Sequence, residues 1–127
     1  MSSSMPDDRP SIESPLMRSV SVHDLKAALD GTTGDGVEPV EVIDVREPWE
    51  YAEGHVPGAR LVPLASVPQH LNDFPQDFPR DRPVYLVCHV GGRSAQAAHF
   101  LAQRGVDAVN VDGGTADWES AGYPLHR

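Results

Sequence analysis

Short runs of apolar residues recur along the chain, and charged or turn-forming residues separate them. The run VEVIDV, at residues 40–45, is rich in β-branched side chains and predicts a buried strand that ends at Asp44. The run VYLVC, at residues 84–88, is nearly continuous, which is typical of a strand covered on both faces in a parallel sheet. A further strand is expected in AVNV, at residues 108–111, and a shorter one around residues 60–62.

Helical patterns alternate with these runs. The segment SVSVHDLKAALDG places Ser21 as an N-cap, repeats apolar residues at helical spacing, and stops at Gly31. A second helix is expected in RSAQAAHFLAQRG, at residues 93–105, with Gly105 as its stop. Shorter helices are expected over residues 48–52 and from Thr115, which would cap the last one.

The remaining segments are predicted to be irregular. A loop is expected before Val84, because prolines stand at Pro75, Pro79 and Pro83. Residues 1–18 are rich in Ser, Pro and Asp and poor in large apolar groups, so we expect a disordered N-terminal arm. Residues 19–127 then form one domain, and the alternation of strands and helices predicts an α/β fold.

Charge and cysteine content narrow the classes of function. The formal net charge of −9 makes nucleic acid an unexpected partner, and an anionic substrate would need positive charge supplied locally by its own site. No apolar run approaches the roughly 20 residues that span a bilayer, so no membrane role is expected. One cysteine and a polar, proline-broken start predict a reducing, cytoplasmic location.

The single cysteine stands where chemistry is expected. Cys88 ends a predicted buried strand, and open α/β sheets place binding crevices at such ends. Gly91 and Gly92 follow, and a helix begins next, so backbone N–H groups can converge on the sulfur and lower the pKa of its thiol. The alternative interpretation of Cys88 alone is a small apolar residue that fills the core.

The pattern Cys88-x-x-Gly91-x-Arg93-Ser94 resembles the active-site loop of the rhodanese (sulfurtransferase) family. Two further segments agree in the same order: DVREPWEYAEGHVPGA at residues 44–59, and VDGGTADWESAGYPL at residues 111–125. The match covers about residues 20–125 and resembles the single-domain form of the family. It implies a rhodanese-like fold, with a central parallel sheet and helices on both faces.

The resemblance also implies a mechanism. The Cys88 thiolate attacks a small anionic sulfur donor such as thiosulfate, and the resulting persulfide passes its outer sulfur to cyanide or a thiol. Residues that would bind the donor are His89, Val90, Gly91, Gly92, Arg93 and Ser94, and Arg93 would add fixed positive charge. Asp44 would orient the loop or pair with an arginine, and the alternative is an aspartate that caps a turn. Arg46 would line the entrance or stay at the surface with Glu47 and Glu50.

Some residues depart from the commoner pattern or leave roles open. At His89 and Val90 the family often has Arg and a small polar residue, which puts the identity of the donor in doubt. His89 either contacts the donor or lies solvated in the loop. The six histidines show no ligand spacing with cysteine, so neither a metal nor another cofactor is expected.

Two other functions compete with the enzyme. One is a sulfur-relay or binding module that acts with a protein partner and turns over little free thiosulfate. The other is a phosphatase or arsenate reductase. Cysteine phosphatases use Cys-x5-Arg, whereas Cys88 and Arg93 are spaced Cys-x4-Arg, and the chain lacks a second cysteine to resolve an oxidised intermediate.

Overall fold

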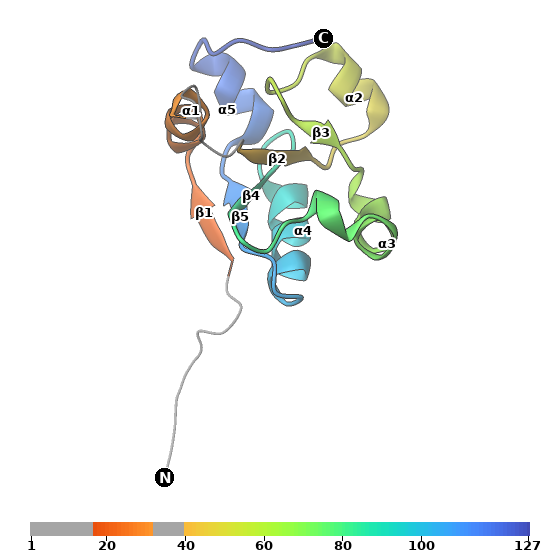
Figure 1. The fold of residues 1–127 in the computed structure, drawn as a ribbon. Coiled ribbons are helices and arrows are strands. Elements are labelled where there is room, and N and C mark those ends of the chain that lie inside the picture. Colours follow the sequence, from red (N-terminus) through yellow and green to blue (C-terminus); the bar gives the residue numbers. More distant parts are fainter. Residues whose placement is uncertain (1–16, 32–39) are drawn as a thin grey trace.

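The computed structural model describes residues 17–31 and 40–127, and its centre is a parallel sheet of five strands in the order β1-β5-β4-β2-β3 (Figure 1). The strands are β1 (Arg18–Val20), β2 (Glu41–Asp44), β3 (Arg60–Leu61), β4 (Val84–Val87) and β5 (Ala108–Val111). Every neighbouring pair is parallel, so the carboxyl ends of all five strands meet at one edge of the sheet. The predicted α/β class with a central parallel sheet is confirmed.

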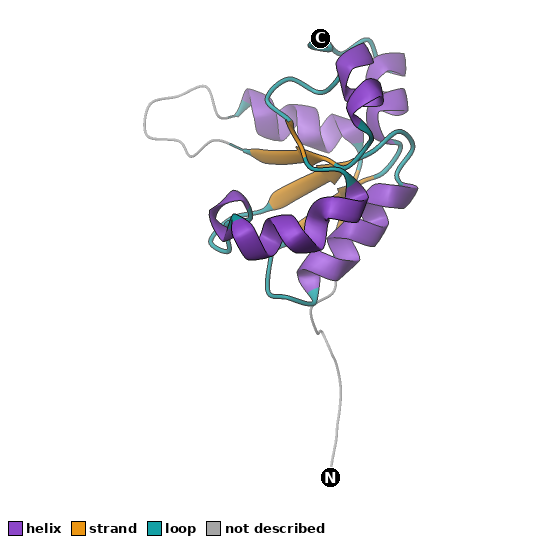
Figure 2. Ribbon diagram, turned by 90° about the vertical axis from the view of Figure 1, so that its right-hand side faces the viewer, coloured by secondary structure: helices purple, strands orange, loops and turns teal. Residues whose placement is uncertain are grey.

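Helices cover both faces of this sheet (Figure 2). They are α1 (Val22–Asp30), α2 (Pro48–Glu53), α3 (Val67–Asp73), α4 (Gly92–Ala102) and α5 (Gly114–Ser120), with single 3-10 turns at Leu64–Ser66 and Pro75–Asp77. The predicted cap of the first helix is confirmed, since the Ser21 side chain accepts from the Asp24 N–H and the Asp24 carboxylate accepts from the Ser21 N–H. No helix within the described segments is long and apolar enough to span a membrane.

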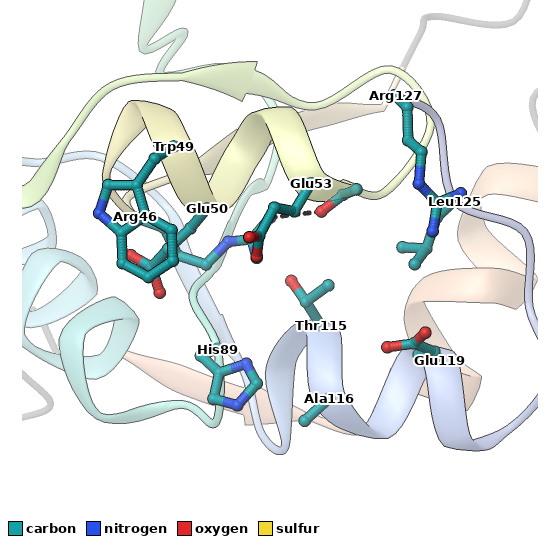
Figure 3. Close-up of a pocket in the computed structure, with 11 residues that line it drawn as sticks. Arg46, Trp49, Glu50, Glu53, His89, Thr115, Ala116, Glu119, Leu125 and Arg127 are labelled. Carbon is teal, nitrogen blue, oxygen red and sulfur yellow. Dashed lines mark hydrogen bonds between the residues drawn. The ribbon is translucent and has the colours of Figure 1, made fainter.

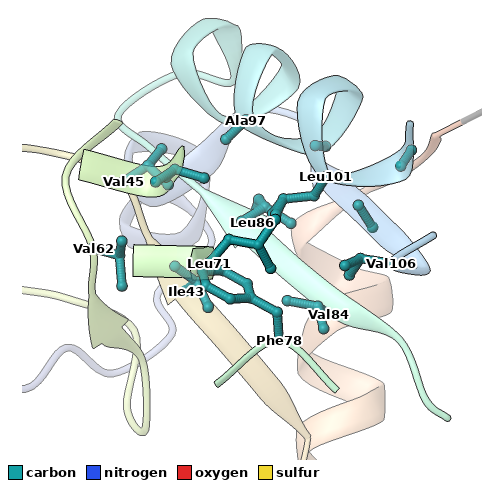
Figure 4. Close-up of a cluster of buried hydrophobic side chains, with 14 of the residues drawn as sticks. Ile43, Val45, Val62, Leu71, Phe78, Val84, Leu86, Ala97, Leu101 and Val106 are labelled. Carbon is teal, nitrogen blue, oxygen red and sulfur yellow. The ribbon is translucent and has the colours of Figure 1, made fainter. Parts of the chain in front are cut away.

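The side chains of β4 show why its sequence is apolar throughout. Val84 and Leu86 pack into the core on the face covered by α3 and α4 (Figure 4), whereas Tyr85 and Val87 pack into the core beneath α1 and α5. Cys88, directly after the strand, belongs to the same cluster as Val84 and Leu86. Full burial of one such aliphatic side chain stabilises the fold by about 1.5–3 kcal/mol. A strand with a core on each face therefore cannot show the polar alternation of a half-exposed strand.

Two elements differ from the sequence-based prediction. α3 lies in the segment that was predicted to be a loop, and its buried Val67 and Leu71 are one turn apart on the same face. Pro68 stands in the first turn, where the missing N–H has no helical partner to lose, so this proline starts the helix instead of breaking it. Pro68 lies in the first turn of α3 and Pro83 directly before β4, so prolines in this region lie at the ends of secondary-structure elements and do not exclude a helix.

The other difference is at the start of the domain. β1 begins at Arg18, which was assigned to the N-terminal arm, and Arg18 pairs with Val109 of β5 in the sheet. Backbone pairing and an ion pair between Arg18 and Asp107, at 2.9 Å, hold this edge strand without an apolar pattern. The rest of the predicted arm, apart from Met17, lies outside the described residues, as do residues 32–39.

Candidate active site

Cys88 lies directly after β4, at the edge of the sheet where the carboxyl ends of all strands meet. α4 begins at Gly92, so only three residues lie between the cysteine and the helix. This connection is too short to leave the sheet edge. It therefore curls over the strand end and brings the first turn of α4 against the sulfur.

The curl depends on a left-handed residue at Gly91, which has a φ of 115°. A side chain there would be strained whatever its size, because L-residues rarely adopt this conformation. The turn aims the Gly91 N–H at the sulfur, with 3.0 Å between the nitrogen and Cys88 Sγ. The Ser94 hydroxyl lies 3.3 Å from the same sulfur.

The thiol of Cys88 is only 1% exposed, yet its surroundings favour the charged form. Burial raises the pKa of the thiol, because desolvation disfavours a thiolate. The Ser94 hydroxyl and the backbone N–H groups of Ser94, Gly91 and Val90 outweigh that penalty, so the pKa of Cys88 lies below its ordinary value. The sulfur therefore lies in a site built to hold negative charge.

The first turn of α5 fixes the other side of this loop. The N–H groups of Thr115 and Ala116 donate to the carbonyl oxygens of Cys88 and His89, each at 2.9 Å. The Thr115 hydroxyl also donates to the Cys88 carbonyl, at 3.1 Å. With these carbonyls turned toward α5, the N–H groups that follow in the chain are free to face the sulfur.

Thr115 is therefore not the helix cap that the sequence predicted. α5 begins at Gly114 with Gly113 as its N-cap, and Thr115 uses its hydroxyl on the cysteine loop. A Cβ on Gly114 would overlap the Cys88 carbonyl oxygen and lie 2.7 Å from that of His89. The absence of a side chain at Gly114 thus permits the close approach of α5 to the cysteine loop, a packing requirement that the sequence pattern alone does not specify.

The positive charge expected of Arg93 is present, and it is paired with a carboxylate. The guanidinium donates two hydrogen bonds to Glu50 of α2, at 2.8 and 2.9 Å. The Glu50 side chain is 13% exposed, and its hydrogen bond with Arg93 lowers the pKa of its carboxyl to about 2. In one of the two interpretations of Arg46, the sequence places Glu50 at the surface, because no local pattern links positions 43 residues apart.

Asp44 and Arg46 form a second ion pair, which is buried at the end of β2. Arg46 Nη2 and Asp44 Oδ2 are 2.9 Å apart, and the same nitrogen donates to the Gly54 carbonyl at 2.8 Å. Asp44 therefore pairs with an arginine, one of its expected roles, and its Oδ1 also accepts from the Arg46 backbone N–H at 3.0 Å, as a turn cap would. The Arg46 side chain does line the cavity described next, with its charge matched by Asp44.

A cavity of about 400 Å³ opens beside the cysteine loop, between α2 and α5 (Figure 3). His89 lies at one end of it, and Val90 is 63% exposed nearby in the loop. The wall contains the carboxylates of Glu50, Glu53 and Glu119 and the guanidinium groups of Arg46 and Arg127, of which Arg46 is paired with Asp44. Lining residues are Arg46, Trp49, Glu50, Glu53, Gly54, His89, Thr115, Ala116, Glu119, Leu125 and Arg127.

No cluster of three potential metal ligands occurs among the described His, Cys, Asp and Glu residues. The groups that the site offers for chemistry are the thiol, the N–H groups around it and the two ion pairs. That arrangement suits a nucleophilic sulfur which becomes charged without needing a base. His55 is used structurally, since its ring stacks on Tyr51 with 3.7 Å between the ring centroids.

Known proteins that are similar to this chain in sequence include sulfurtransferases. A sulfurtransferase of Allochromatium vinosum is 36% identical over 89 residues, which cover 69% of this chain and 79% of the relative. The thiosulfate sulfurtransferase GlpE of Pseudoalteromonas translucida is 34% identical over 85 residues, covering 66% of this chain and 77% of the relative. Sulfur transfer is thus the activity named for these relatives.

The fold has solved counterparts. The crystal structure of SSP1007 from Staphylococcus saprophyticus superposes with a TM-score of 0.72 at 38% identity, covering 87% of this chain and all of the other. The sequence profile of the rhodanese-like domain matches residues 21–121, which include β2, the cysteine loop and α5. The chain belongs to the rhodanese-like domain family, as its cysteine loop had suggested.

Proposed function

We propose that the chain is a sulfurtransferase that carries sulfane sulfur as a persulfide on Cys88. The donor is a small anion such as thiosulfate, and the acceptor is a thiol or cyanide. The observation that carries this proposal is the contact of Cys88 Sγ with the Gly91 N–H, at 3.0 Å, and the Ser94 hydroxyl, at 3.3 Å. The sulfurtransferase relatives support the same general chemistry.

The first step is an attack of the Cys88 thiolate on the outer sulfur of thiosulfate. A new S–S bond forms, the bond between the two sulfurs of thiosulfate breaks, and sulfite leaves with the bonding electron pair. The outer sulfur, now bonded to Cys88 Sγ, carries the negative charge. No base is required, because the nucleophile is already ionised.

In the second step the acceptor attacks the outer sulfur of the persulfide. Cyanide becomes thiocyanate, or a thiolate becomes a persulfide, and the Cys88 thiolate leaves with the electrons of the broken S–S bond. The N–H groups of Val90, Gly91 and Ser94 favour the thiolate at the start of one step and the end of the other. Because these donors are fixed by the curl of the loop, little reorganisation is needed.

The test is the intact mass of the protein after incubation with thiosulfate and again after cyanide, with Cys88→Ser as the control. We expect one added sulfur atom on the wild-type chain, its removal by cyanide, and no addition to the variant. A wild-type mass that thiosulfate leaves unchanged would contradict this donor. Hydrolysis of an aryl phosphate, lost in Cys88→Ser, would instead support the phosphatase.

A second candidate is a sulfur-relay module whose donor or acceptor is another protein. It is favoured by the cavity wall, where Glu53 and Glu119 form no ion pair with any described residue and would repel a dianion. Trp49, in the same wall, is 64% exposed. Under this alternative, Cys88 loads slowly from free thiosulfate, and added salt accelerates loading by screening the carboxylates.

A further inference from the structure

The Ser94 hydroxyl lies within hydrogen-bond reach of three acceptors. They are Cys88 Sγ at 3.3 Å, the Gly91 carbonyl at 3.2 Å and Asn110 Oδ1 at 2.6 Å. A hydroxyl has one proton, so it can donate fully to only one of them. Which acceptor receives this proton decides whether Ser94 presents a donor or a lone pair to the sulfur.

The contact between Ser94 Oγ and Asn110 Oδ1 is the shortest of the three, and it indicates which acceptor receives the proton. An O···O separation of 2.6 Å is at the short end of the range for O–H···O hydrogen bonds, so the proton lies between Ser94 and Asn110. Asn110 stands in β5 and is only 3% exposed, so no bulk water can replace its partner. Losing the Ser94 proton would leave a buried carbonyl oxygen without a donor.

The orientation of the Asn110 amide is fixed from its other end. Asn110 Nδ2 donates to the Asp112 carboxylate at 2.9 Å. If the amide were flipped, its oxygen would face that carboxylate, and two acceptors would meet without a proton between them. Asp112 therefore keeps the carbonyl of Asn110 turned toward Ser94.

We propose that Asn110, oriented by Asp112, is a positioning residue that holds the Ser94 hydroxyl proton away from Cys88 Sγ while Cys88 is a thiol, and yields it when the sulfur becomes charged. This proposal deepens the proposed function, because it concerns the nucleophile of that reaction. It assigns to Asn110 and Asp112 a role in setting the reactivity of a cysteine that neither residue touches.

The two charge states of the sulfur use the hydroxyl differently. In the thiol state a continuous chain is satisfied: the Cys88 S–H donates to Ser94 Oγ, Ser94 donates to Asn110, and Asn110 donates to Asp112. When the thiol proton leaves to solvent, the Ser94 hydroxyl rotates to donate to the thiolate and Asn110 Oδ1 loses its donor. No proton passes along the chain. Asn110 therefore opposes ionisation, and the N–H groups of the loop favour it.

Other titratable groups surround the same loop and are not part of this hydrogen-bond chain. They belong to β2 and the residues after it, α2, the loop itself, α4 and α5. They are Asp44, Arg46, Glu50, His89, Arg93 and Asp117. A test therefore has to separate the direction of one hydroxyl from a change in total charge.

The experiment measures the pH dependence of Cys88 alkylation by iodoacetamide in the wild type, Asn110→Leu and Asp112→Asn. Asn110→Leu removes the competing acceptor and keeps the number and branching of the side-chain heavy atoms, and Asp112→Asn lets the amide flip. We expect both variants to shift the alkylation midpoint to lower pH by about 0.5 to 1 unit, the net worth of one neutral hydrogen bond. General loosening of the loop would shift the midpoint upward, toward that of free cysteine.

A Ser94→Ala background supplies the matched control. There the hydroxyl is absent, so Asn110→Leu should no longer move the midpoint, and any shift that Asp112→Asn retains measures its charge alone. Equal acid shifts with and without Ser94, or no acid shift in either variant, would overturn the proposal. If Asn110→Leu fails to fold, the exposed Asp112→Asn variant alone decides. Alkylation does not depend on thiosulfate, so this result stands apart from the persulfide test.

Discussion

Arg93 and Glu50 form a two-pronged ion pair that joins the first turn of α4 to α2, with N···O distances of 2.8 and 2.9 Å. The pair matches the positive charge of Arg93 with a carboxylate. The charge that Arg93 presents therefore depends on α2, a helix that the cysteine motif does not include.

Glu50→Gln should make thiosulfate a better donor. The change frees the Arg93 charge and removes a negative charge from the cavity wall, so we expect loading of Cys88 to become several-fold faster at low salt and to lose this advantage at high salt. Timed intact-mass measurements of persulfide formation provide the readout. Asp73→Asn, on α3, changes net charge equally and should have no effect; an equal gain there would point to net charge alone.

The same ion pair predicts a difference in acid stability. Because the pKa of Glu50 is lowered to about 2 in the folded chain, its contribution is present above its ordinary value of 4.5 and is lost as the pH falls toward 2. Wild type should therefore lose more free energy of unfolding than Glu50→Gln between pH 5 and pH 2. Urea titrations at several pH values measure this, and parallel curves for the two proteins would contradict it.

Gly114→Ala should destabilise the fold and disturb the cysteine loop together. The added Cβ would overlap the Cys88 carbonyl, so we expect a loss of more than about 2 kcal/mol and slower alkylation of the thiol. Gly122→Ala is the matched control, because Gly122 also has a positive φ, of 82°, but a Cβ there meets nothing within 4 Å. That variant should lose only about 1–2 kcal/mol of left-handed strain and keep the wild-type alkylation rate. Equal effects from both substitutions would show that the contact of Gly114 with the Cys88 carbonyl adds nothing beyond left-handed strain.

Asp44→Ala should be among the most damaging single substitutions. It leaves the buried Arg46 guanidinium without its carboxylate, which typically costs about 3–5 kcal/mol. Arg18→Ala breaks the exposed pair with Asp107 and should cost at most about 1 kcal/mol. Chemical unfolding of the two variants, side by side, checks the contrast, which would vanish if burial did not matter.

The central strands and the cysteine loop could be predicted because their signals are local, whereas β1, which has no apolar pattern, could not. Apolar runs mark β2, β4 and β5, and the Cys88, Gly91 and Ser94 spacing places a thiol at a strand end before a helix. The contacts that complete the site carry no such signal. Glu50 is 43 residues from Arg93. Asn110 is a single polar residue within an apolar strand, and nothing in the sequence indicates that its side chain contacts Ser94.

The prolines show a different limit. Their density before Val84 predicts irregular chain, but Pro68 occupies a first helical turn, which a proline tolerates. Composition alone does not distinguish a proline that starts a helix from one that interrupts it. The buried pair Val67 and Leu71 was the available signal, and it spans only one turn.

The grip of α5 on the cysteine loop also bears on how the chain is made. Thr115, whose backbone N–H and hydroxyl hold the Cys88 carbonyl, is synthesised 27 residues after that cysteine. During translation the thiol therefore leaves the ribosome well before the helix that shapes its surroundings. The surroundings of Cys88 are complete only once α5 has been made, so a nascent chain that ends before α5 carries the cysteine without the hydrogen bonds that hold its loop.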